Sequence, residues 1–159
     1  MIVLNSINDK LAFKQLVKAE CIKQINQRIS NAKAAVNQAQ EAANNSEKST
    51  AGDKYETARA MGQLDSDMNS KQLIEAEQEL MVLEKIDVSS LTDSIKIGSL
   101  FELSGLLFFV AIGLGPLTID DKKIMVVSSK SPFFENIKTM KTGQVFEFHD
   151  KMDEIKLVF

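Results

Sequence analysis

The chain of 159 residues is poor in several residue types: it has two prolines, one cysteine, one histidine, one tyrosine and no tryptophan. A lone cysteine, Cys21, cannot form an internal disulfide, and because it lies near Ile22 and Ile25 we expect a small core residue. The lone histidine, His149, leaves no basis for a Ser-His-Asp arrangement, and there is no zinc-ligand cluster or glycine-rich phosphate loop. These absences exclude the common catalytic constellations.

The chain also lacks an excess of positive charge and a long hydrophobic run. Its 19 Lys and Arg against 22 Asp and Glu give a net charge of −3, which does not favour direct binding to nucleic acid. The longest apolar run, residues 105–114, is shorter than the roughly 18 residues that span a bilayer, and residues 1–4 are too short for a signal-peptide core. We therefore expect a cytoplasmic protein with no membrane contact.

Proline, glycine and phenylalanine are unevenly distributed along the chain. Residues 1–115 contain no proline, residues 1–51 contain no glycine, and eight of the nine phenylalanines follow residue 90. The first part is therefore predicted to be helical and the second to form a sheet. The sequence predicts an α+β protein with domains at 1–90 and 91–159.

The first domain shows the spacing of paired helices. One helix is predicted from near Ser6 or Asn8 to about Asn44, and a second over residues 53–87. Alternating intervals of three and four residues connect Ile22, Ile25, Ile29, Ala32, Val36, Ala39 and Ala43, and likewise Leu73, Ala76, Leu80 and Leu83. In the second helix Met61, Leu64 and Met68 have similar spacing but a different phase, which predicts an interrupted seam.

The charges of the two predicted helices are opposite. Residues 10–33 carry a net charge of +5 and residues 53–87 a net charge of −5. Such charges favour an antiparallel coiled-coil hairpin within one chain, and hence a monomer, with its tip at about 45–53. A first helix of this length would reach roughly 55 Å.

The second domain is predicted to be a small antiparallel sheet with one short helix. Strand-like runs lie at about 95–103, 105–113, 117–128, 143–149 and 153–158, and a short helix or turn at 132–137. A domain of about 65 residues would be only marginally stable alone.

Acidic residues near the tip are the candidate functional residues of the first domain. Asp53 and Glu56 lie three residues apart in the first turn of the second helix, with Glu47 before them. Acids at this position favour the helix dipole, which is one explanation for them. The alternative is that they help bind a divalent cation at another protein's active site, since Mg²⁺ often takes only one or two protein carboxylates.

Two stretches resemble the Gre transcript-cleavage factors of bacterial RNA polymerase. Residues 51–58, Ala-Gly-Asp-Lys-Tyr-Glu-Thr-Ala, resemble the family's Gly-Asp-x-x-Glu segment at the hairpin tip. Residues 124–133, ending in Ser131-Pro132-Phe133, together with 141–146, are similar to the Ser-Pro segment and Lys-x-Gly turn of the family's FKBP-like domain. The order of hairpin and sheet domain also matches the family.

The resemblance implies a transcription elongation factor that binds RNA polymerase through its secondary channel and meets RNA only there. Asp53 and Glu56 would be the catalytic and metal-binding acids, sharing with the polymerase a Mg²⁺ that hydrolyses backtracked RNA. Aligning by tyrosine instead matches Tyr55 and shifts the acids toward Glu47. Partner binding would involve Glu47, Tyr55 and the segment Ser131, Pro132 and Phe133. The chain would be no enzyme and hold no cofactor of its own, but would activate cleavage by the polymerase.

Three other functions are compatible with these features. The first is a polymerase-binding regulator that does not stimulate cleavage. The second is a coiled-coil interaction protein whose hairpin serves as a dimerisation arm. The third is an FKBP-like prolyl isomerase or chaperone, whose apolar pocket would be lined by Phe101, Phe108, Phe109, Phe133, Phe134, Phe146 and Phe148.

Overall fold

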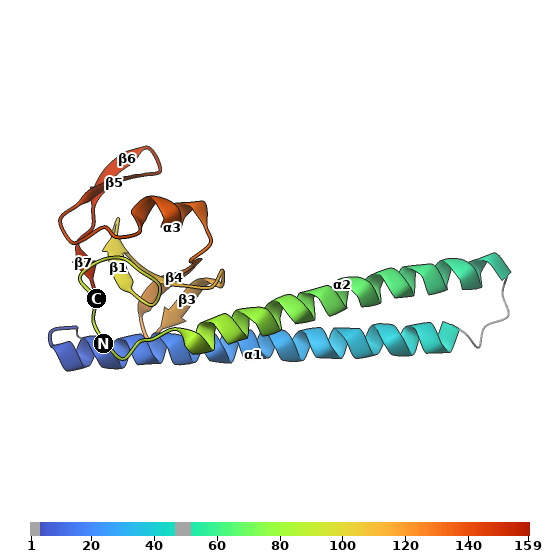
Figure 1. Ribbon diagram of the computed structural model, residues 1–159. Helices are drawn as coiled ribbons and strands as arrows, with labels where there is room; N and C mark the ends of the chain where they lie inside the picture. The colour runs from blue at the N-terminus through green and yellow to red at the C-terminus, as the bar shows by residue number, and fades with distance from the viewer. Residues whose placement is uncertain (1–3, 47–51) are drawn as a thin grey trace. The chain divides into compact units, whose positions relative to one another are not determined.

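The computed structural model of the protein describes residues 4–46 and 52–159, with side chains for 4–45 and 56–159 (Figure 1). Within this part the chain is α+β, as predicted: helices α1 (Ile7–Ser46) and α2 (Gly52–Lys85) precede a run of short strands. The chain forms two compact units, one of Met1–Lys23 with Val82–Phe159 and the other of Gln24–Met81. The domain boundary near residue 90 stays a prediction.

The start of α1 is fixed by a reciprocal pair of hydrogen bonds. The Ser6 hydroxyl oxygen accepts from the backbone N–H of Asp9 at 3.0 Å, and the Asp9 carboxylate accepts from the N–H of Ser6 at 3.1 Å. This capping box satisfies two N–H groups that have no partner within the helix. The predicted start near Ser6 is confirmed.

Within the unit Gln24–Met81, α1 and α2 contact each other in antiparallel order. Near one end Arg28 Nη1 lies 3.3 Å from Glu79 Oε2. Near the other, a Cβ placed on Gly62 would lie 3.8 Å from the Cβ of Ala43. Since a later residue of α1 meets an earlier residue of α2, the two helices run in opposite directions, and the end of α1 lies at the same end of this unit as the start of α2.

The face that α2 turns inward differs from the prediction. Met61, Leu64 and Met68 are 61%, 63% and 61% exposed, so they do not belong to the seam. The buried or half-buried positions repeat without interruption at intervals of four and three residues: Gly62, Ser66, Asn69, Leu73, Ala76 and Leu80. The predicted interruption is therefore wrong, because small residues continue the seam where α1 carries alanine.

The main sheet has five strands in the described residues, in the order β3-β4-β2-β1-β7. Their bounds are β1 (Leu100–Leu103), β2 (Leu106–Ala111), β3 (Gly115–Ile119), β4 (Lys122–Ser128) and β7 (Leu157–Val158). The run predicted as one strand at 117–128 is a hairpin, with Asp120 at the turn in a left-handed conformation (φ 50°).

This hairpin also makes the sheet mixed, which corrects the predicted antiparallel arrangement. Strand β3 leads outward and β4 returns between β3 and β2, so that β2 and β4 run parallel, with Phe109 opposite Val126. The predicted run at 153–158 likewise divides between two sheets. Its first part belongs to β6 (Lys151–Glu154), which pairs with β5 (Val145–Phe148), and its end forms β7.

The sheet is buried on both faces, as its consecutive apolar residues require. Strand β2 buries Phe108, Phe109, Val110 and Ala111 in succession. One face forms a cluster with α3 (Pro132–Ile137), the short helix predicted at 132–137, and includes Phe101, Phe108, Phe134 and Ile137. In the same unit α1 buries Phe13, Val17 and Cys21, so Cys21 is a core residue as expected.

Candidate functional site

The predicted acidic residues lie around the start of α2. The helix begins at Gly52, so Asp53, Tyr55 and Glu56 all fall within its first two turns, where carboxylates interact favourably with the helix dipole. The side chain of Glu56 is exposed. Glu47 and the side chains of Asp53 and Tyr55 lie outside the described part of the chain. The only acid of this group whose side chain is described is therefore open to a partner.

The described side chains form no metal site of their own at this end of the unit. In the part of the chain that is described, no three His, Cys, Asp or Glu side chains gather closely enough to hold one. A single exposed carboxylate such as Glu56 suits Mg²⁺ only where substrate, water or another protein completes the coordination.

The segment Ser131-Pro132-Phe133 forms the start of α3. The Ser131 hydroxyl accepts from the N–H of Phe134 at 3.2 Å and donates to the carbonyl of Ser128 at 2.7 Å. Pro132 occupies the first helical turn, where its missing N–H is not needed, and its side chain is exposed. Ser131 and Phe133 thus have local structural roles, and Pro132 is the exposed member.

Phe133 belongs to an aromatic cluster rather than to the wall of an open site. Its ring centroid lies 5.4 Å from that of Phe108, 5.9 Å from Phe146 and 5.5 Å from Phe148. Phe101 and Phe108 stack at 5.1 Å. These rings fill space against one another, so the side chains suggested for a prolyl-isomerase pocket contribute to the core.

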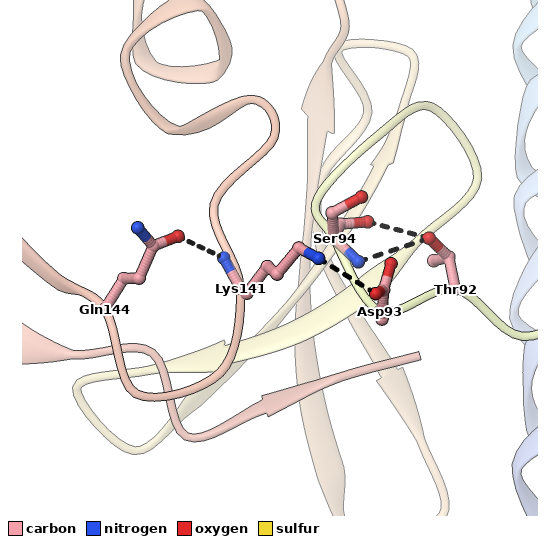
Figure 2. A network of polar contacts seen from close by, with 5 residues as sticks. All are labelled: Thr92, Asp93, Ser94, Lys141 and Gln144. Atoms are coloured by element: carbon pink, nitrogen blue, oxygen red, sulfur yellow. Dashed lines mark hydrogen bonds and ion pairs between the residues drawn. The ribbon is translucent and has the colours of Figure 1, made fainter.

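The predicted Lys-x-Gly turn is tied to the segment that follows α2 (Figure 2). Lys141 Nζ lies 3.1 Å from Asp93 Oδ2, and the Lys141 N–H donates to Gln144 Oε1 at 2.7 Å. Beside them the Thr92 hydroxyl donates to the carbonyl of Ser94 at 2.9 Å. The Lys141 ammonium, by its hydrogen bond first and its charge second, holds the pKa of Asp93 below its ordinary value. The arrangement fixes the loop that contains Lys141 to the segment after α2.

Two lysines of α1 bind the backbone where α2 ends. Lys18 Nζ donates to the carbonyls of Glu84 at 3.0 Å and Ile86 at 2.7 Å, and Lys14 Nζ donates to the carbonyl of Ser90 at 2.8 Å. A cation at the C-terminus of a helix satisfies carbonyls that lack intrahelical partners. Lys14 is 2% exposed, and burial is the main cause that lowers its pKa.

These lysine contacts were not predicted from the sequence. The positive charge of residues 10–33 was assigned to pairing with acidic side chains, of which Arg28–Glu79 is an instance. Lys14 and Lys18 instead bind carbonyl oxygens. A usable signal is their position beside the buried Phe13, Val17 and Cys21, because lysines on a buried face need fixed acceptors.

Sequence reasoning also missed an exposed apolar surface on α2. Met61, Leu64, Met68, Ile74 and Met81 are between 54% and 63% exposed. The signal that would have revealed it is the series Gly62, Ser66 and Asn69, which continues the buried seam and therefore turns Met61, Leu64 and Met68 outward.

A shallow groove of about 330 Å³ lies between α1 and α2 within the unit Gln24–Met81. It is lined by Ala32, Ala35 and Ala76 together with the paired Arg28 and Glu79. The small side chains explain the groove.

Across the ranges 4–46 and 52–159, no helix combines the length and apolar character needed to cross a membrane. Compared with protein-family models, with curated proteins and with solved structures, the chain matches none of them.

Proposed function

We propose that this chain is a Gre-like regulator of bacterial RNA polymerase, with an antiparallel coiled-coil hairpin and an FKBP-like C-terminal domain. One observation carries the proposal: α1 and α2 run antiparallel, so the start of α2, which contains Asp53 and Glu56, lies at one end of the helical unit. Acids at the end of a narrow pair of helices can enter a channel that a globular domain cannot.

The chemistry of the acids supports a role shared with the polymerase. Asp53 and Glu56 would each offer a carboxylate to a Mg²⁺ whose other ligands come from the polymerase, the RNA and water. The metal would activate a water that attacks a phosphodiester of the backtracked transcript. The hairpin would thus complete an active site that it does not itself contain, and the chain would act as an activator.

The C-terminal domain would bind outside the channel. Within it, Lys130, Pro132 and the turn at 141–145 are the exposed parts of the resembling segments, where a partner can reach them. Ser131 and Phe133 would hold this surface in place, Ser131 by capping α3 and Phe133 by packing in the aromatic cluster.

The test uses stalled, backtracked complexes of the polymerase from the same organism. The intact chain should bind them and shorten the RNA, and absence of both effects would remove the proposal. Binding without shortening would select the regulator that occupies the channel without stimulating cleavage.

Variants at the tip distinguish coordination from docking. Asp53→Asn or Glu56→Gln should abolish cleavage while leaving polymerase affinity within a few fold, because each removes a ligand and keeps the shape. Glu77→Gln, at another exposed acid of α2, serves as the matched control and should retain cleavage. Equal losses of affinity and cleavage would show that the acids dock rather than coordinate.

A further inference from the structure

A pocket of about 420 Å³ opens at one end of the main sheet, within the unit that contains the sheet. Because β2 and β4 are parallel, they begin at the same end, and the β1–β2 and β3–β4 turns come side by side there. The start of β7 lies at this end as well, since β7 runs antiparallel to β1. The parallel pairing, which was not predicted from the sequence, therefore assembles the pocket. Its volume falls within the range of about 300–1,000 Å³ that is typical of small-molecule sites.

Four leucines form the apolar part of the pocket: Leu4, Leu106, Leu107 and Leu157. Leu106 is 39% exposed, and the other three are half-buried. Apolar side chains that are partly open to water inside a pocket favour a ligand that covers them with apolar groups. We therefore expect the ligand to carry apolar side chains.

Two acids and two lysines form the charged part of the pocket: Glu102, Asp121, Lys122 and Lys123. Asp121 and Lys123 are exposed, whereas Glu102 and Lys122 are half-buried. Within the described residues, neither Glu102 nor Lys122 has an ion pair or a side-chain hydrogen bond. A half-buried carboxylate and a half-buried ammonium group are therefore both available to one ligand.

Glu102 and Lys122 project from the same face of the sheet. Glu102 pairs with Leu107, and Leu107 pairs with Ile124, which follows Lys122 by two residues. Paired residues, and residues two apart on one strand, have their side chains on the same face. Two strand spacings across the sheet and two residues along it put the Cα atoms of Glu102 and Lys122 roughly 12 Å apart. The two charged residues thus lie on either side of a leucine of the pocket.

The balance of charge in the pocket restricts the ligand to one class. An anion would bring its charge close to Glu102 and Asp121, and a cation would bring its charge close to Lys122 and Lys123. An uncharged ligand would take water away from Glu102 and Lys122 without replacing it, which is unfavourable for charged groups. A ligand that carries one ammonium group and one carboxylate gives each of the two half-buried charges a partner.

We propose that this pocket binds the zwitterion of a short apolar peptide, with the peptide's ammonium group at Glu102, its carboxylate at Lys122 and its side chains on the leucines. An extended dipeptide spans roughly 7 Å between its two ends, so Glu102 and Lys122 can each reach one end of the same molecule. The inference does not rest on the proposed function, because the pocket uses none of the acids at the start of α2.

Titration of the full chain with L-leucyl-L-leucine, followed by NMR, is the first test. We expect saturable binding, with the resonances of Glu102, Leu107 and Lys122 among those that shift. N-acetyl-leucyl-leucine lacks the ammonium group and leucyl-leucine amide lacks the carboxylate, so each should bind at least about fivefold more weakly. Diglycine keeps both charges but lacks apolar side chains, and it should bind at least about tenfold more weakly. The absence of saturable binding, or equal affinity for the free and the blocked peptides, would overturn the proposal.

Two variants assign the ends of the peptide. Glu102→Met removes the partner of the ammonium group, so leucyl-leucine and its N-acetyl form should bind with affinities within about twofold of each other. Lys122→Met should have the same effect on leucyl-leucine and its amide. Glu147→Met and Lys151→Met change exposed charges on β5 and β6, outside the pocket, and as matched controls they should keep the preferences of the parent chain. Circular dichroism confirms that each variant stays folded. If Glu102→Met and Lys122→Met keep those preferences too, the peptide binds elsewhere and the proposal is refuted.

Discussion

Among the glycines in the unit that contains the sheet, Gly98 should be the one whose replacement by alanine lowers the free energy of unfolding most. Gly98 has φ 88°, and a Cβ built on it would lie 2.8 Å from the carbonyl oxygen of Asp87 and 3.0 Å from Ile86 Cγ2. Its own N–H donates to the carbonyl of Val110 at 2.8 Å, so the backbone cannot move away without losing a bond to β2. Gly98 is therefore held between the segment after α2 and the sheet.

The expected magnitude has two parts. A left-handed conformation costs a non-glycine residue about 1–2 kcal/mol, and overpacking against a fixed backbone costs about 1–3 kcal/mol more. Alanine also lowers the conformational entropy of the unfolded chain, which offsets about 0.4–1 kcal/mol of this loss of stability. Gly98→Ala should thus lower the free energy of unfolding by about 2–4 kcal/mol.

Gly105→Ala is the control that separates the two parts. Gly105 also has a positive φ, 75°, but a Cβ there would meet nothing within 4 Å. It should cost about 1 kcal/mol or less, since only the conformational part remains. Urea titrations followed by circular dichroism compare the two. If Gly98→Ala costs no more than Gly105→Ala, the close approach of the Asp87 carbonyl is refuted.

Three other side chains can be tested singly. Ser131→Ala removes the cap of α3 and should cost about 1 kcal/mol in the same titration, and no loss would argue against the cap. Because folding lowers the pKa of Asp93, its contribution to stability is present above the ordinary carboxyl pKa and lost as pH falls through the folded value. Lys141→Met should therefore return the Asp93 pKa toward its ordinary value in an NMR titration. Cys21, whose pKa burial raises to about 12, should react with a thiol reagent near neutral pH only as fast as the chain unfolds, and prompt labelling would contradict its burial.

The helices could be predicted from local signals because those signals lie in contiguous residues. The spacing of Ser6 and Asp9 is typical of the start of a helix. The spacing of Ile25, Ile29 and Ala32 indicates the buried face of α1. The same method was right for the later part of α2, where Leu73, Ala76, Leu80 and Leu83 are buried or half-buried. It failed over Met61–Met68, where the apolar side chains face water and the seam uses the small residues Gly62, Ser66 and Asn69. A hydrophobicity pattern ranks residues by the free energy of moving their side chains out of water. Where two helices approach closely, the side chains between them must also be small, and hydrophobicity does not report size.

The sheet was harder to predict because its strands are buried on both faces. In β2 the consecutive Phe108, Phe109 and Val110 show no alternation, so the pattern gives neither the direction nor the neighbours of the strand. The turn at Asp120–Asp121 carries no glycine, and without that signal 117–128 looked like one strand. Parallel pairing of β2 with β4 depends on that turn, so one missed reversal changed the whole topology.

In the candidate site, too, contacts between neighbouring residues could be predicted and contacts between distant residues could not. The α3 segment was recognised from adjacent residues, since Ser131 and Pro132 cap and start a helix through local bonds. The contacts of Lys14 and Lys18 were not, because their acceptors are carbonyl oxygens more than sixty residues away, and every residue carries such an oxygen.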